Sequence, residues 1–170
     1  MTDVQQRFFE RLDQLGTGGR AALRRSAGTM LREADGQALS AFYRCLPSVV
    51  EERDAAKWFA VACLRCCWDA GGTEGKALEQ VISELIRRAD LSESSRHRVE
   101  LLLDTRWDND GYLLTKLARL IKLVRQKSDR EKLDFSSLLD DLLRWNYESQ
   151  SVQRKWVRAI FGNDNDEERE

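Results

Sequence analysis

The stretch Leu113–Lys127, LLTKLARLIKLVRQK, predicts the fold of this chain because its apolar residues recur with a helical period. At about 100° per residue they fall within about one third of the helix circumference. Leu123 is the only apolar residue outside this stripe. The rest of the helix carries five cations and no acid, and these are Lys116, Arg119, Lys122, Arg125 and Lys127.

The absence of acidic residues from this face needs a physical cause. An ordinary solvated helix face mixes Glu with Lys, because unmixed like charges one turn apart repel by about a few tenths of a kcal/mol per pair. One interpretation is a core helix whose outer face is cationic by chance. The other is a surface that binds phosphate. The helix by itself leaves both interpretations open.

The composition favours an all-α protein. The chain has 170 residues, of which 42% are hydrophobic, and it can bury a core without disulfides or metals. Its single proline, Pro47, leaves long stretches in which nothing prevents a helix. Apolar stripes and capping signals predict about nine helices, at 3–15, 19–28, 38–46, 51–70, 76–89, 93–104, 113–127, 135–145 and 152–161. The expected N-caps are Thr2 or Asp3, Ser92, Asp108, Asp134, and Ser149 or Ser151.

We expect these helices to form two small bundles, residues 1–90 and 91–162, because LSESS at 91–95 has the character of a linker and a helix cap. Residues 163–170 form a tail with five acids and one base, which cannot bury apolar surface and is expected to be disordered. The whole chain has a net charge of −1, and without this tail it is positive. Any nucleic-acid site is therefore a local patch rather than a global field.

Arginines outside the basic helix form two further candidate clusters. The first follows a glycine-rich turn, and a polar helix surface explains it as well as a binding site does. It consists of Arg20, Arg24 and Arg25. The second precedes the basic helix and extends its positive surface. It consists of Arg96, Arg98 and Arg106.

The cysteines and the histidine do not indicate a metal site. Cys63 and Cys66 form a CxxC, but it lies inside a helical pattern with no second pair, and His97 is the only histidine. Together with Cys45 and Cys67 they are better interpreted as reduced, buried, small hydrophobic residues than as zinc ligands. We expect no cofactor.

The sequence also lacks the motifs of an enzyme or a membrane protein. It has no GxSxG, HExxH, Walker-type or Rossmann pattern, so we predict no enzymatic activity. The N-terminus, MTDVQQRFFE, lacks the order of a signal peptide, and the longest apolar run, 58–64, is too short to span a bilayer. We therefore expect a cytoplasmic protein with no membrane partner.

Six segments occur in a distinctive order and spacing, although each alone is an Arg- and Leu-rich helix. They are GGRAALRRSAG, AFYR, SRHRVELLLDTR, LLTKLARLIKLVRQK, LDFSSLLDDLLRW and VQRKWVRAIF. Over residues 5–162 this set resembles the CasB family, the small subunit of the type I-E CRISPR surveillance complex, Cascade. The acidic tail and the Gly71–Gly75 loop lie outside the resemblance.

The resemblance implies an all-helical, non-catalytic protein of two small bundles, present as two copies in a ribonucleoprotein. It implies contacts with the Cascade backbone and large subunits, with guide RNA, and with target DNA opened into an R-loop. Holding a displaced strand whatever its sequence calls for Lys and Arg at phosphates. The contacts implied by position are Arg24, Arg25, Arg96, Arg106 and Arg119, with Lys116 and Lys122 as neighbours and Arg44, Arg53 and Arg144 as weaker matches. The alternative is a helical protein-interaction adaptor whose basic faces dock an acidic partner.

Overall fold

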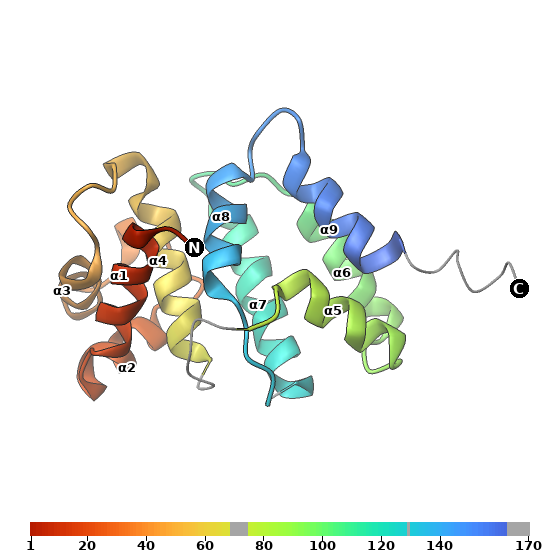
Figure 1. The fold of residues 1–170 in the computed structure, drawn as a ribbon, viewed down its shortest axis with the longest axis horizontal. Helices are drawn as coiled ribbons and strands as arrows, with labels where there is room; N and C mark the ends of the chain where they lie inside the picture. Colours follow the sequence, from red (N-terminus) through yellow and green to blue (C-terminus); the bar gives the residue numbers. More distant parts are fainter. Residues whose placement is uncertain (69–74, 129, 163–170) are drawn as a thin grey trace, which may run out of the picture.

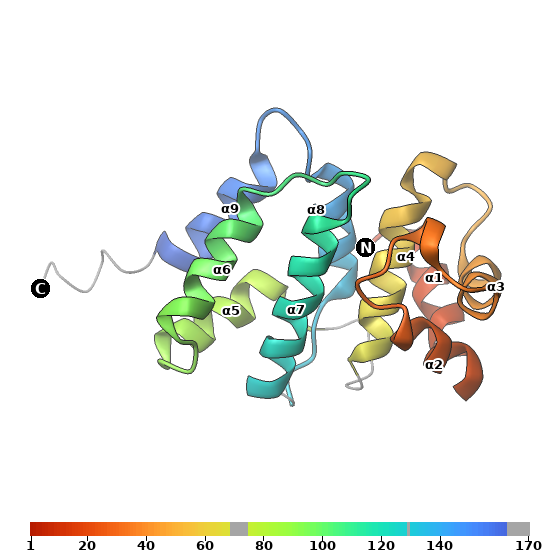
Figure 2. The ribbon, with the colours of Figure 1, turned by 180° about the vertical axis from the view of Figure 1, so that it is seen from behind.

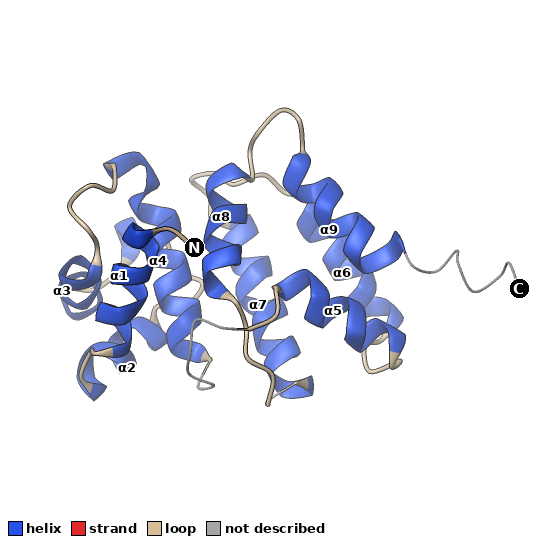
Figure 3. Ribbon diagram, viewed as in Figure 1, coloured by secondary structure: helices blue, strands red, loops and turns tan. Residues whose placement is uncertain are grey.

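The computed structural model of the protein describes residues 1–68, 75–128 and 130–162. Within these residues the chain forms nine α helices, one short 3-10 helix and no strand (Figure 3). The all-α fold class predicted from the sequence is confirmed. The elements are α1 (Asp3–Asp13), α2 (Thr17–Arg25), η1 (Leu31–Glu33), α3 (Gly36–Cys45), α4 (Glu52–Cys67), α5 (Leu78–Arg87), α6 (Glu93–Leu103), α7 (Tyr112–Lys127), α8 (Phe135–Arg144) and α9 (Ser151–Phe161).

Helices α1 to α4 pack together at one end of the molecule (Figure 1). Their core is built on aromatic rings that meet edge to face. The ring centroid of Phe8 lies 4.9 Å from that of Trp58 and 6.5 Å from that of Phe42, which in turn lies 5.3 Å from that of Phe59. Because such pairs are favourable only in defined orientations, these rings hold α1, α3 and α4 in one arrangement.

The other five helices form two layers. Helices α5, α8 and α9 lie toward the viewer in Figure 1, whereas α6 and α7 run side by side on the opposite face (Figure 2). Trp145 and Trp156 pack edge to face between α8 and α9, with their ring centroids 5.6 Å apart. Both indoles are almost fully buried, so they anchor α9 to the rest of the molecule.

The bundle boundary expected at residue 91 stays a prediction. Helix α5 precedes this position in the chain, yet it packs against α7 and α9. One hydrophobic cluster also includes residues from both expected bundles. Helix α5 therefore contacts helices on the other side of the expected boundary.

Helix α4 joins the two groups of helices, since it also packs against α7 and α8. Its Arg65 is 3% exposed, lies 2.9 Å from the Asp13 carboxylate of α1, and places its guanidinium 5.9 Å from the ring centroid of Phe135 in α8. The indole N–H of Trp68 donates to the carbonyl oxygen of Glu131 at 2.9 Å. A buried cation is stable only with such partners, so these contacts set how the two groups meet.

The helix caps are local features, and most of them agree with the sequence. Thr2, Ser92 and Asp134 act as N-caps, as predicted, because their side-chain oxygens accept hydrogen bonds from first-turn amides. The predicted N-cap Asp108 is wrong, and so is the predicted N-cap Ser149 or Ser151, because the N-cap of α9 is Gln150. The N-cap of α7 is Gly111, whose φ of 74° lies in the left-handed region that favours glycine. The Asp108 carboxylate accepts from the Gly111 amide at 3.1 Å and closes a turn before the helix.

The four cysteines are buried and free, as predicted. In the described ranges, no group of three or more His, Cys, Asp or Glu residues is arranged to hold a metal ion. No helix among these residues is long and apolar enough to cross a membrane. The acidic tail at 163–170 and residues 71–74 of the glycine-containing loop lie outside the described part of the chain.

Candidate nucleic-acid interface

The basic helix is α7, and a groove of about 480 Å³ runs between it and α6. We call it the α6–α7 groove. Three of the cations predicted from the sequence line it, namely Arg98 from α6 and Lys116 and Arg119 from α7. The other residues that line it are Leu101, Leu120 and Leu123. Packing of α6 on α7 therefore brings together cations that are up to 21 positions apart in the chain.

The charge of the α6–α7 groove is positive and uncompensated. None of its lining residues is acidic. Among the residues that the structure describes, Arg98, Arg119 and the exposed Lys122 make no ion pair. The Lys116 ammonium lies 5.9 Å from the centroid of the Tyr112 ring, which attracts a cation without neutralising it. The groove is thus available to an anionic ligand.

The floor of the groove is apolar, and sequence reasoning missed it. Leu101 is 44% exposed although it resembles a core residue in the sequence. Leu123, the one apolar residue outside the α7 stripe, is half-buried and faces the same groove. Its irregular position was the one signal in the sequence that could have located this floor.

The N-terminal cluster is partly used by the fold. The Arg24 side chain donates to the carbonyl oxygen of Cys66 at 3.1 Å, at the end of α4. Arg25 is exposed and donates to the Gln37 side chain at 3.3 Å, whereas Arg20 is half-buried. Arg25 is therefore the member of this cluster whose charge is most available to a ligand.

Four other predicted arginines have partners within the molecule. Arg96 donates to the carbonyl oxygen of Ile86, at the end of α5, at 3.3 Å. Arg53 forms an ion pair of 2.9 Å with the carboxylate two residues before it. Arg44 and Arg144 each donate to the carbonyl oxygen four residues earlier in their own helix. The structure disperses these four over different helices, and their role in binding stays a prediction.

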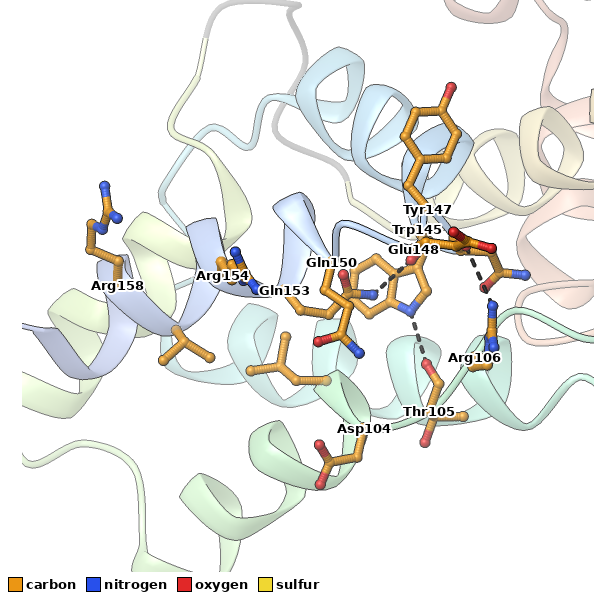
Figure 4. Close-up of a pocket in the computed structure, with 13 residues that line it drawn as sticks. Asp104, Thr105, Arg106, Trp145, Tyr147, Glu148, Gln150, Gln153, Arg154 and Arg158 are labelled. Atoms are coloured by element: carbon orange, nitrogen blue, oxygen red, sulfur yellow. Dashed lines mark hydrogen bonds between the residues drawn. The ribbon is translucent and has the colours of Figure 1, made fainter.

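Arg106 does not line the α6–α7 groove but lies at a second groove of about 740 Å³ (Figure 4). This α6–α9 groove is bordered by the end of α6, the loop between α8 and α9, and α9 itself. The Arg106 guanidinium lies 3.4 Å from the carbonyl oxygen of Asn146 in that loop. No local pattern in the sequence groups Arg106 with α9, because the two are about 50 residues apart.

Comparison with known protein sequences relates the chain to one family. The model of the family described as CRISPR-associated protein Cse2 matches residues 19–161. The CRISPR-associated protein Cse2 of Thermus thermophilus is 31% identical over 112 residues. That match covers 66% of this chain and 59% of the relative, which is less than two thirds of the relative's length.

Solved structures have the same fold. CasB from M. ruber is 26% identical, with a TM-score of 0.75 over 99% of this chain and 98% of that one. A chain from a CRISPR RNA-guided surveillance complex is 23% identical, with a TM-score of 0.68 over 92% of this chain and 88% of that one.

The fold and these similarities define a class, that of all-helical CRISPR-associated proteins. Within it, the chain belongs to the Cse2 family, members of which are also called CasB. The resemblance inferred from the order of the six sequence segments is confirmed.

Proposed function

We propose that this protein is a non-catalytic subunit of a type I-E CRISPR RNA-guided surveillance complex, in which it holds opened target DNA through sequence-independent contacts of Lys and Arg with phosphate. Its partners in this role are the guide RNA, the backbone and large subunits, and a second copy of itself. Family membership and the shared fold of a surveillance-complex chain support the proposal.

The observation that carries the proposal is the α6–α7 groove, which Arg98, Lys116 and Arg119 line together and which no acidic residue lines. When an RNA-guided complex opens a duplex, the new heteroduplex is about as stable as the duplex it replaces. Backbone contacts therefore decide whether the open state persists. Cations on rigid helices make such contacts whatever the base sequence.

A second candidate function is supported by the floor of the same groove. The exposed fraction of Leu101, 44%, suits an amphipathic acidic helix of a partner protein better than a phosphate backbone. This adaptor function predicts no salt-dependent binding of nucleic acid by the isolated protein. The nucleic-acid function predicts such binding.

The direct test is charge reversal on α7. We expect Lys116→Glu, Arg119→Glu and Lys122→Glu together to reduce opening of target DNA by the assembled complex at least about tenfold, since three attractions to phosphate become repulsions. Guide-RNA content is expected to stay near the wild-type value. Opening is measured by permanganate reactivity of unpaired thymines in the target.

The matched control is Arg7→Glu, Arg87→Glu and Arg130→Glu, which makes the same change in net charge at three exposed positions outside the groove. It should leave DNA opening unchanged. A helical α7 variant that assembles and opens DNA as well as wild type would refute the assignment of α7 as the DNA-holding helix.

A further inference from the structure

Helix α9 carries three cations near one another, and the fold uses only one of them. The ammonium of Lys155 lies 2.7 Å from the Asp141 carboxylate and 3.1 Å from that of Glu79. Arg154 and Arg158 are exposed, and among the described residues neither makes an ion pair. Since like charges one turn apart repel, Arg154 and Arg158 together destabilise the helix. No ion pair among the described residues offsets this repulsion.

Both arginines line the α6–α9 groove. Figure 4 shows them on α9, while Arg106 comes from the opposite border, after the end of α6. Arg154 and Arg158 are four residues apart, so they lie on the same side of α9, about 6 Å apart along the helix axis. The groove thus has a positively charged edge made by one rigid helix.

The groove also contains neutral polar groups and two acids. The amide side chain of Gln153 is held by the carbonyl oxygen of Trp145 at 2.7 Å, and Gln150 lies at the start of α9. Asp104 and Glu148 line the groove as well and repel an anion. An anionic chain is therefore confined to the α9 edge, with its uncharged parts toward the middle of the groove.

We propose that the α6–α9 groove is a second nucleic-acid site, which binds a single strand with its phosphates on Arg154 and Arg158. The inference rests on the proposed function and adds a site to it. A volume of about 740 Å³ accommodates a nucleotide, whereas a duplex is too wide to enter and rests on the outside. The exposed amide of Gln150, which lines the same groove, supplies a donor and an acceptor for bases or sugars of any sequence.

The test uses the full-length chain and a fluorescent 20-mer of thymidine. With Arg154→Gln and Arg158→Gln together, the slope of log K against log salt should fall in magnitude by about 1.4, because a single-strand contact contributes about 0.7. Binding of a duplex of the same length should change less. Arg7→Gln with Arg87→Gln is the matched control, as both arginines are exposed and lie outside the grooves.

A second measurement needs no variant. Photocrosslinking of the wild-type protein to a 4-thiothymidine oligonucleotide is expected to label peptides that contain residues 146–158. If no crosslink maps there and the glutamine variant behaves like its control, the second site does not exist. Capture of an acidic peptide instead of DNA by the same groove would overturn the assignment of its ligand.

Lys116→Glu with Arg119→Glu, measured in parallel, separates the two proposals. If this α7 variant loses DNA binding while the α9 variant keeps it, only the second site is refuted. If neither variant binds more weakly than wild type, the proposed function fails together with the inference.

Discussion

Arg24 of α2 and Arg125 of α7 donate hydrogen bonds to the carbonyl oxygens of two consecutive residues, Cys66 and Cys67, at the C-terminal end of α4. A helix C-terminus carries partial negative charge and unpaired carbonyls, so two guanidinium groups stabilise it. The same contacts place the N-terminal arginine cluster next to the end of the basic helix. The two cation clusters that are far apart in the sequence therefore meet at α4.

This arrangement separates the roles of neighbouring arginines. Arg24→Ala should lower the free energy of unfolding by about 1 kcal/mol, because it removes a charged hydrogen bond from a helix end. Arg25→Ala should change it by less than about 0.5 kcal/mol, as is usual for an exposed site. Urea denaturation followed by circular dichroism measures both. Equal losses would show that the contact of Arg24 with Cys66 contributes nothing.

The isolated protein is expected to bind single- and double-stranded nucleic acid weakly and without sequence preference. If six cations engage phosphate, log K against log salt should have a slope of about −4 to −5. Fluorescence anisotropy over a series of salt concentrations measures it. A flat salt dependence would favour the adaptor function.

Deleting residues 163–170 should strengthen nonspecific DNA binding and leave the melting temperature unchanged. The deletion removes five acids and one base. The acids compete with phosphate for the cationic surfaces, so DNA binds more tightly without them. A variant with Asn or Gln at the five acidic positions keeps the length of the tail and should reproduce the effect. Weaker binding by either variant would mean that the tail has another role.

Asp141 is expected to be the most important charged residue for the stability of α9. It is 1% exposed and accepts hydrogen bonds from Lys155 and from the Trp156 indole, each at 2.7 Å. Asp141→Ala leaves the buried indole N–H without its partner, so we expect a loss of about 3 kcal/mol in the free energy of unfolding.

The control for this loss is Asp104→Ala, because Asp104 is exposed and makes no ion pair among the described residues. It should be nearly neutral. Chemical denaturation of both variants gives the comparison. A similar, small effect of the two substitutions would contradict the importance of the Asp141 contacts.

The buried thiols predict a loss of stability at high pH. Burial raises the pKa of Cys45 and of Cys66, each from 9.0 to about 11, against the opposing effect of nearby arginines. Because the folded state holds these protons more tightly than the unfolded state, their contribution to stability is complete below pH 9 and is lost as the pH rises toward 11.

Two measurements check this prediction. At pH 8 the native protein should react slowly with a thiol reagent and the urea-unfolded protein quickly, since the thiolate is the reactive form. The free energy of unfolding of Cys45→Ala should also fall less steeply between pH 9 and pH 11 than that of the wild type. Fast reaction in the native state would show that these thiols are accessible.

Much of the candidate site could be predicted from the sequence, because the helical period of α7 alone separates its buried apolar residues from its exposed cations. The stripe of Leu113, Leu117 and Val124 is buried, and the cations Arg119 and Lys122 are exposed, as the helical period requires. The apolar floor and the partner residue Arg98 could not be located, because they depend on how α6 packs on α7.

Local patterns were enough to predict the helices, most of their caps and the set of cations, because periodicity and capping act between residues a few positions apart. Three features needed the folded chain: α5 packs with α7 and α9, Arg24 contacts the end of α4, and Arg154 and Arg158 share a groove with Arg106. These contacts form because helices far apart in the chain bury apolar surface against one another. No local pattern in the sequence encodes which of these surfaces meet.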